Sequence, residues 1–338
     1  MSSREPQFVV AATPFEKRPV DTPTIMLHVL YALVPVTLAA VYYFGVSAVL
    51  LLSTCTIACM FTEWLLGARG GWRESSISDG SAAVTGILLA LTLPPGLPLW
   101  MAATGAVVSI VFGKFLFGGL GQNVFNPSLT GRAFLQAAFP VAMTTWSPQQ
   151  TFNGFLNFHG DTFAWPLLRP VIDGLSAATP LARMKFDAEL TDVSNLMLGS
   201  ISGSLGETSA ILILLGGAYL TWRKFLNWRI PVGIFASTYL FASLLHLMDP
   251  VVFPDGVHHL FAGGLMLGAL FMATDPVTSP VTPRGCWVFA IGTGVLVIVI
   301  RQFGGLPEGV MYAILLMNAA TPLIDRFTQP TLYGTVSD

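Results

Sequence analysis

The sequence predicts an all-α polytopic membrane protein with about ten transmembrane helices, because apolar stretches long enough to cross a bilayer recur along it. Of its 338 residues, 53% are hydrophobic and 10% are charged, whereas about 25% of the residues of an ordinary soluble domain are charged. A soluble fold of this size could not bury so much apolar surface. A recurring four-residue block divides the predicted helices into two halves.

The strongest candidates for membrane spans are long apolar stretches, several of which reach the roughly 20 residues that a transmembrane helix needs. They are Ile25 to Phe44, Val46 to Leu66, Leu99 to Phe117, Ala210 to Trp222, Pro231 to Leu247, Leu260 to Ala273, Cys286 to Ile300 and Gly309 to Ile324. Ala82 to Leu93 and Pro127 to Phe139 are shorter, so we expect short or broken helices that face protein or a cavity. Leu196 to Leu205 lies just before the stretch that starts at Ala210, and we count the two as one interrupted span.

The spans divide the chain into two predicted five-helix repeats, residues 25–139 and 196–325, separated by a loop at 140–195. A segment at 1–24 precedes them and a tail at 326–338 follows. Phe117-Gly118-Gly119-Leu120 recurs as Phe303-Gly304-Gly305-Leu306, each time after the fourth span of its half. Gly-Gly pairs are also common in membrane helices, so the match alone is weak. Because each half has an odd number of spans, the halves should enter the membrane from opposite sides, as an inverted repeat.

Charge sets the expected orientation and location. Positive residues gather in the N-terminal segment and in the short loops on the same side, whereas the short loops on the other side carry only Arg301. Both termini are therefore predicted to be cytoplasmic and the central loop periplasmic, in a bacterial inner membrane. The N-terminus lacks the features of a cleavable signal, so we expect it to be retained. The net charge of -2 does not suggest a nucleic-acid partner.

Charged residues inside apolar sequence are candidates for function, because an unpaired charge in lipid is costly. Glu63 and Arg132 lie deepest, and each is either part of a structural ion pair or a candidate for the ion path. Lys114, Arg301 and Asp325 lie near predicted helix ends, where snorkelling to the membrane surface is the favoured interpretation.

The cysteines do not predict a metal site. Cys55, Cys59 and Cys286 lie in apolar segments, and their number and spacing fit neither a disulfide framework nor a four-thiolate cluster. We expect structural roles, with a cluster shared with another subunit as the alternative.

The most informative motif is Asp173-Gly174-Leu175-Ser176-Ala177-Ala178-Thr179-Pro180-Leu181 in the central loop. Taken alone, Asp-Gly indicates a turn and Thr-Pro a helix end. A hydroxyl among small residues is also a sterically open acceptor for a bulky group. The residues by themselves leave both interpretations open.

The run resembles the Asp-Gly-x-Ser-x-Ala-Thr signature at which a flavin transferase esterifies threonine with the phosphate of FMN. That signature occurs in the D subunit of the Rnf complex and the B subunit of the sodium-pumping NADH:quinone reductase. The resemblance covers nearly the whole chain. It includes Gly118 to Pro127, Gly131 to Phe134, Thr274 to Thr278 and Phe303 to Gly309. The short N-terminus and the form Gly-Gly-Leu-Gly-Gln-Asn favour the Rnf type, and Ala177 occupies a position that the signature leaves open.

The resemblance implies two flavins. Thr179 would carry covalent FMN within the motif formed by Asp173, Gly174, Ser176 and Ala178. Riboflavin would bind without a covalent bond among the helices, with Asn123 and Asn126 as candidate contacts. Their amides suit the mixed donor and acceptor edge of an isoalloxazine ring. The alternative is that Asn126-Pro127 caps a helix.

The function implied is that of a membrane flavoprotein subunit in an Rnf-type ferredoxin:NAD oxidoreductase complex, coupling electron transfer to sodium or proton translocation. Its expected partners are the A, B, C, E and G type subunits, a flavin transferase and the lipid bilayer. No catalytic residue of its own is required, because redox chemistry belongs to the cofactor, and the chain should not act alone. The alternatives are a urea-transporter-like solute transporter or channel and a structural anchor. A flavin on Thr179 would distinguish the flavoprotein subunit from both the transporter and the structural anchor.

Overall fold

The computed structural model is helical or irregular, without a strand, throughout the residues that it describes. These are residues 21–67, 76–147, 162–166, 178–187, 189–207, 209–250 and 252–330. The predicted all-α polytopic fold is confirmed, since four helices are long and apolar enough to cross a membrane. They are Thr22–Gly67, Leu99–Phe117, Arg229–Met248 and Pro283–Phe303.

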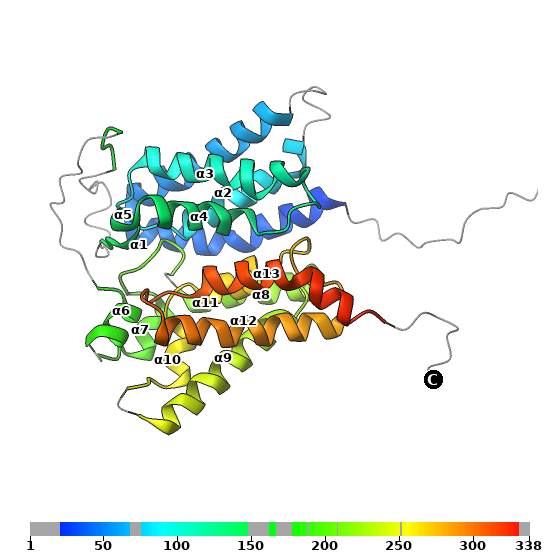
Figure 1. Ribbon diagram of the computed structural model, residues 1–338. Helices are drawn as coiled ribbons and strands as arrows, with labels where there is room; N and C mark the ends of the chain where they lie inside the picture. Colours follow the sequence, from blue (N-terminus) through cyan, green and yellow to red (C-terminus); the bar gives the residue numbers. More distant parts are fainter. Residues whose placement is uncertain are drawn as a thin grey trace, which may run out of the picture.

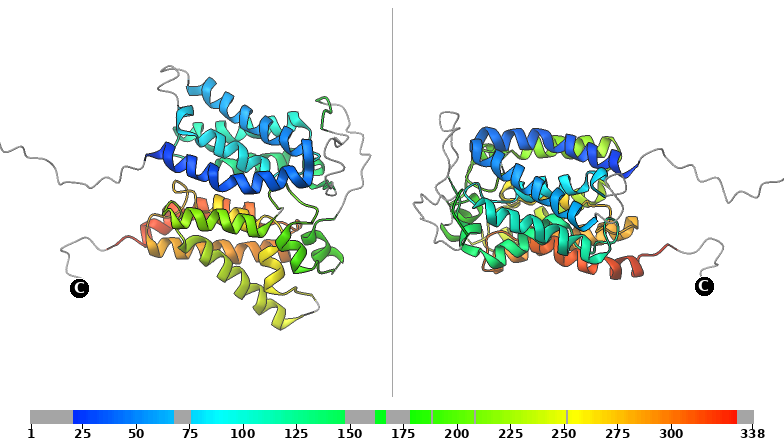
Figure 2. Two further views of the ribbon diagram at one scale, coloured as in Figure 1. Left: turned by 180° about the vertical axis from the view of Figure 1, so that it is seen from behind. Right: turned by 90° about the horizontal axis from the view of Figure 1, so that it is seen from above.

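The first half begins with a single long helix, α1 (Thr22–Gly67), which contains two of the predicted spans. Its helical conformation breaks at Gly45, where φ is 61° and ψ is -141°, a region that glycine enters without steric cost. The helix folds back there, so its dark and lighter blue parts run in opposite directions in both Figures 1 and 2. The rest of the half is α2 (Ser81–Leu91), α3 (Leu99–Gly113) with a 3₁₀ turn at Phe115–Phe117, and α4 (Pro127–Ala138).

The second half contains two regular helices, a broken span and two further regular helices. They are α8 (Ala210–Trp222), α9 (Arg229–Met248), the broken span described next, α12 (Pro283–Phe303) and α13 (Val310–Phe327). The span predicted at Leu260 to Ala273 consists of α10 (Gly256–Phe261), α11 (Leu265–Leu267) and a π-helical turn at Gly268–Met272. Gly263, with φ of 71°, separates the first two pieces.

The predicted central loop contains short helices. They are α5 (Pro140–Thr144), α6 (Pro180–Ala182), a π-helical turn at Arg183–Asp187, and α7 (Val193–Leu198). The interruption expected before Ala210 begins at Gly199, the C-cap of α7, with φ of 92°. Beyond it, the backbone N–H groups of Leu205 and Gly206 donate to the carbonyls of Leu93 (3.1 Å) and Leu91 (2.6 Å) at the end of α2.

The two halves lie side by side as two groups of helices. Figures 1 and 2 show α1 to α4 on one side and α8 to α13 on the other. The start of α1 and the end of α13 lie at one end of the bundle, and α6 and α7 lie at the opposite end (Figure 1). The first half thus begins at one end of the bundle and the second at the other.

Small residues allow the helices of each half to approach closely. A Cβ added to Gly86 in α2 would lie 2.6 Å from the Thr56 Cα and 2.9 Å from the Cys55 carbonyl oxygen of α1. Backbone atoms cannot turn away as a side chain can. Gly86 therefore fixes the distance between α2 and the second part of α1, as small residues do at helix contacts in membranes.

We expect Gly86→Ala to destabilise the purified protein by about 1–3 kcal/mol through overpacking. The measurement is the midpoint of thermal unfolding in detergent. Gly292→Ala in α12 is the matched control, because its new Cβ would meet the flexible end of Met317 at 2.7 Å. Equal shifts in the two variants would contradict the role given to Gly86.

Candidate functional site

A cavity of about 360 Å³ lies beside Thr179, at the end of the bundle where α6 lies. Both halves and the segment between them contribute to its wall, and we call it the Thr179 cavity. Its lining includes Arg132, Gln136, Met143, Trp146, Ala178, Thr179, Phe186, Glu207, Glu308 and Tyr312. Aromatic and charged side chains from distant parts of the chain therefore meet around one threonine.

Thr179 is the N-cap of α6. Its Oγ1 accepts a hydrogen bond from the Ala182 backbone N–H at 3.1 Å, and Pro180 occupies the first helical turn. A helix start at Thr-Pro corrects the helix end that local sequence suggested, because proline is well tolerated in a first turn. The residue is only 6% exposed. Its hydroxyl is thus held in place, and the side chain is largely shielded from solvent.

The structure describes only the last part of the predicted attachment motif. Ala178 and Thr179 line the cavity together. Asp173, Gly174 and Ser176 lie outside the described residues. Their part in the motif remains a prediction.

Arg132 of α4 forms an ion pair with Glu308, which precedes α13. Glu308 also accepts from the Gly264 backbone N–H at 3.3 Å. The pair therefore joins the two halves across the cavity wall. Its charges compensate each other, and Glu207 lies close enough to interact with Arg132 as well.

Glu63 forms a second buried ion pair, with Lys114 at 2.6 Å. Lys114 also donates to the Ser81 hydroxyl at 2.6 Å, whereas Glu63 Oε2 has no hydrogen-bond partner among the described residues. The snorkelling expected of Lys114 is wrong, because it is 3% exposed. It is also wrong for Arg301, which is buried and donates to the carbonyl oxygens of His259 and Ala262.

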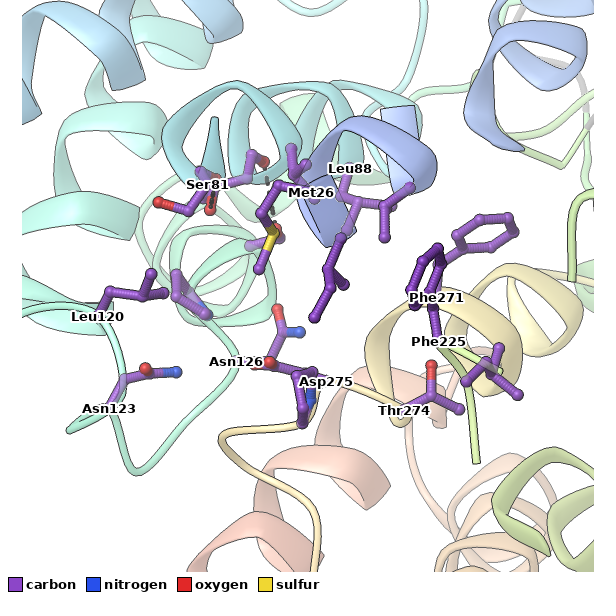
Figure 3. A pocket seen from close by; sticks show the side chains of 18 of the residues that line it. Met26, Ser81, Leu88, Leu120, Asn123, Asn126, Phe225, Phe271, Thr274 and Asp275 are labelled. Atoms are coloured by element: carbon purple, nitrogen blue, oxygen red, sulfur yellow. Dashed lines mark hydrogen bonds between the residues drawn. The ribbon is translucent and has the colours of Figure 1, made fainter. Parts of the chain in front are cut away.

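A second, smaller cavity of about 90 Å³ lies between the halves near the start of α2. Figure 3 shows Asn123, Asn126 and Asp275 along one side of it, with Met26 and Leu88 facing them. We call it the asparagine cavity. Lys114 and Ser81 also line it, so the Glu63–Lys114 pair lies directly behind its wall.

The two asparagines differ in how fully they are bonded. Asn126 caps α4, because its Oδ1 accepts from the Leu129 N–H at 3.3 Å, and its amide donates to the Met272 carbonyl at 3.2 Å. The Asn123 amide donates to the Phe125 carbonyl at 3.3 Å, but its buried Oδ1 has no partner among the described residues. Capping thus accounts for Asn126, and Asn123 retains an unused acceptor.

Sequence reasoning missed one residue of the cavity wall, Glu207, and one residue of the segment that follows Thr179, Lys185. Lys185 donates to the carbonyl oxygens of Gly304 and Leu306, which joins the segment after α6 to the second Gly-Gly block. Desolvation lowers the pKa of Lys185 below its ordinary value. Glu207 lines the cavity from the interruption before α8. Glu207 could have been found from the sequence, because an acidic residue lies just before the apolar stretch that starts at Ala210. No local pattern marks Lys185.

The three cysteines are buried among the helices. The Cys59 thiol lies 3.6 Å from the Ala106 carbonyl oxygen and the Cys286 thiol 3.1 Å from that of Pro280. Cys55 similarly faces the Ala102 carbonyl. These contacts support the structural roles expected for them.

Comparison with known proteins identifies the family. The model of the NQR2, RnfD, RnfE family matches residues 9–334. The D subunit of the ion-translocating oxidoreductase complex of Stutzerimonas stutzeri is 46% identical over 92% of this chain and 91% of its own length. The D subunit of the proton-translocating ferredoxin:NAD(+) oxidoreductase complex of Clostridium ljungdahlii is 40% identical over 97% of this chain and 96% of its own.

Another relative carries a different ion in its name. The D subunit of the Na(+)-translocating ferredoxin:NAD(+) oxidoreductase complex of Acetobacterium woodii is 39% identical over 98% of this chain and 96% of its own length. The chain is thus about equally similar to a relative named as proton-translocating and to one named as Na(+)-translocating. The chain belongs to the NQR2, RnfD, RnfE family, as a D-type membrane subunit of an ion-translocating oxidoreductase complex.

Proposed function

We propose that this chain carries electrons through FMN bound by a phosphoester to Thr179, as a subunit of an Rnf-type ferredoxin:NAD oxidoreductase complex. The observation that carries the proposal is that Thr179 lines a cavity of about 360 Å³. Cavities of about 300–1,000 Å³ are typical of cofactor sites. The relatives named as ferredoxin:NAD(+) oxidoreductase subunits support the reaction.

The aromatic residues at the Thr179 cavity fit a flavin ring. Trp146, Phe186 and Tyr312 offer aromatic surface to a planar ring system. When bound, the flavin supplies the redox chemistry. The chain's part is to hold the group by Thr179, to orient it between the halves, and to exclude water from it.

Riboflavin is proposed for the asparagine cavity. The unpartnered Asn123 Oδ1 supports this assignment, because a buried acceptor without a donor is costly and a ring N–H could satisfy it. The cavity is narrow, at about 90 Å³. A flavin ring would enter it only after flexible side chains such as Met26 turn aside.

The coupled ion is proposed to be sodium or a proton. Of the two candidates for the ion path, Glu63 is the better placed, because its Oε2 has no partner among the described residues. Arg132 is engaged with Glu308, which favours a structural role for it over a role in the path.

We further propose an inner-membrane location with both termini cytoplasmic and the Thr179 region periplasmic. The charge asymmetry of the sequence supports it. The A, B, C, E and G type subunits would then be its partners in the assembled complex, and a flavin transferase would act on it from the periplasm.

The orientation can be tested by labelling introduced cysteines in intact cells. Trp165→Cys should react with a membrane-impermeant maleimide added outside the inner membrane, and Phe327→Cys should react only after the membrane is opened. Both parent residues are highly exposed, at 76% and 84%, and the native cysteines are buried. The reverse labelling pattern would contradict the proposed orientation.

Asn123→Leu should reduce the flavin that is released on mild denaturation and leave the covalent flavin attached, because it removes the unpartnered acceptor. Asn195→Leu in α7 is the matched control at an exposed position. The readout is the absorbance of released flavin per folded protein. An unchanged yield from Asn123→Leu would leave Asn123 without a role in flavin binding.

Thr179→Val should abolish covalent flavin while the protein still inserts and folds, because valine keeps the shape and lacks the hydroxyl. In-gel fluorescence after denaturation should disappear, and the tryptic peptide with residue 179 should lose the mass of the FMN phosphoester. Ser194→Ala, which removes an exposed hydroxyl outside the motif, is the control and should keep both signals. Fluorescence that survives Thr179→Val would move the acceptor, and an unmodified wild-type peptide from cells containing the transferase would favour the transporter alternative.

A further inference from the structure

The proposed acceptor hydroxyl is enclosed when the chain is folded. Thr179 is 6% exposed, and the two residues that follow it, Pro180 and Leu181, are buried as well. Its Oγ1 is already engaged by the Ala182 N–H. Thr179 lines a cavity whose walls come from both halves, including Arg132 of α4 and Glu308 before α13. A second protein cannot reach this oxygen from outside without moving some part of that wall.

The attachment reaction needs more room than the cavity gives, and this step of the inference rests on the proposed function. Thr179 Oγ1 would attack the phosphorus of an activated FMN, a phosphoanhydride such as flavin adenine dinucleotide. A new O–P bond forms, the anhydride P–O bond breaks, nucleoside monophosphate leaves with the electron pair, and the hydroxyl proton passes to a base of the transferase. The attacking and leaving oxygens lie roughly in line through phosphorus. The flavin part of the donor, its nucleoside monophosphate part and the transferase must therefore all fit around the threonine.

The residues that hold Thr179 in this enclosed position form a small and local set. Leu181 packs in a hydrophobic cluster separate from the main core, together with Met184, Leu196, Ile201 and Ala262. Lys185 donates to the carbonyl oxygens of Gly304 and Leu306. Residues 178–187, which we call the α6 segment, could therefore leave their place while the membrane helices stay packed, because local openings of weakly held segments need not involve the core.

We propose that the transferase acts on Thr179 before the α6 segment docks, and that docking then encloses the attached FMN between the halves. The order is attachment first and closure second. The enclosure that keeps water from the flavin would otherwise exclude the enzyme that installs it. Thr179 can thus be modified before the α6 segment docks against Gly304 and Leu306, and docking completes the folded chain.

The test is the rate at which FMN is added to complexes that have already folded. Membranes containing the full complex are prepared from cells that lack the transferase, and purified transferase and flavin adenine dinucleotide are added. Attachment to Thr179 is followed by in-gel fluorescence and peptide mass. The wild-type complex should be loaded slowly, although the same chain synthesised together with the transferase is fully loaded.

Leu181→Ala should load at least about tenfold faster than the wild type, because it removes the buried anchor of the α6 segment. Leu89→Ala is the matched control, since it truncates a fully buried leucine of the main core, and its rate should stay close to that of the wild type. Lys185→Met should also accelerate loading, and it provides an independent test if Leu181→Ala fails to assemble.

Wild-type loading as fast as that of both loosened variants would overturn the proposed order, as would equal acceleration by Leu89→Ala. A chain that carries no phosphoester even when it is synthesised with the transferase would overturn the proposed function itself. The two failures are therefore distinguishable.

Discussion

The fold depends on one constraint, which is that backbone N–H and C=O groups at membrane depth must find partners inside the protein. Where α2 ends at Leu91 and the interruption before α8 begins, each segment has groups that no helix satisfies. The two segments satisfy each other's backbone groups, because the N–H groups of Leu205 and Gly206 donate to the carbonyls of Leu93 and Leu91. A break in one half is thus paired with a break in the other, and separating the halves would expose the backbone groups of both.

Broken segments also explain why the polar side chains gather where they do. The asparagine cavity lies where the start of α4 meets the end of the π-helical turn at Gly268–Met272. Asn126 bridges the two by donating to the Met272 carbonyl. The Thr179 cavity lies where Glu308 and Glu207 approach Arg132. In each place irregular backbone brings polar groups into a mostly apolar interior, as discontinuous helices do at the binding sites of membrane transporters. Both cavities therefore form at interruptions of the helices, where the two halves contact each other.

Much of this could be predicted from sequence, because span length and composition are local properties. The two spans of α1, the short α2 and α4, and the break before α8 all follow from apolar length and the positions of Gly and Pro. What could not be predicted depends on contacts between distant residues. Lys114 and Arg301 lie near span ends, where snorkelling is the local expectation, but Glu63 and backbone carbonyls hold them inside. The enclosure of Thr179 likewise depends on Glu308 and Lys185, which no local pattern connects to it.

The turn at Gly45 has a consequence for how the chain enters the membrane. Phe44, Gly45 and Ser47 are all buried, and a single residue outside helical conformation joins the two parts of α1. No polar loop therefore has to be moved across the lipid between the first two spans. They can be inserted as one helical hairpin, and the rest of the first half would then assemble on these two helices.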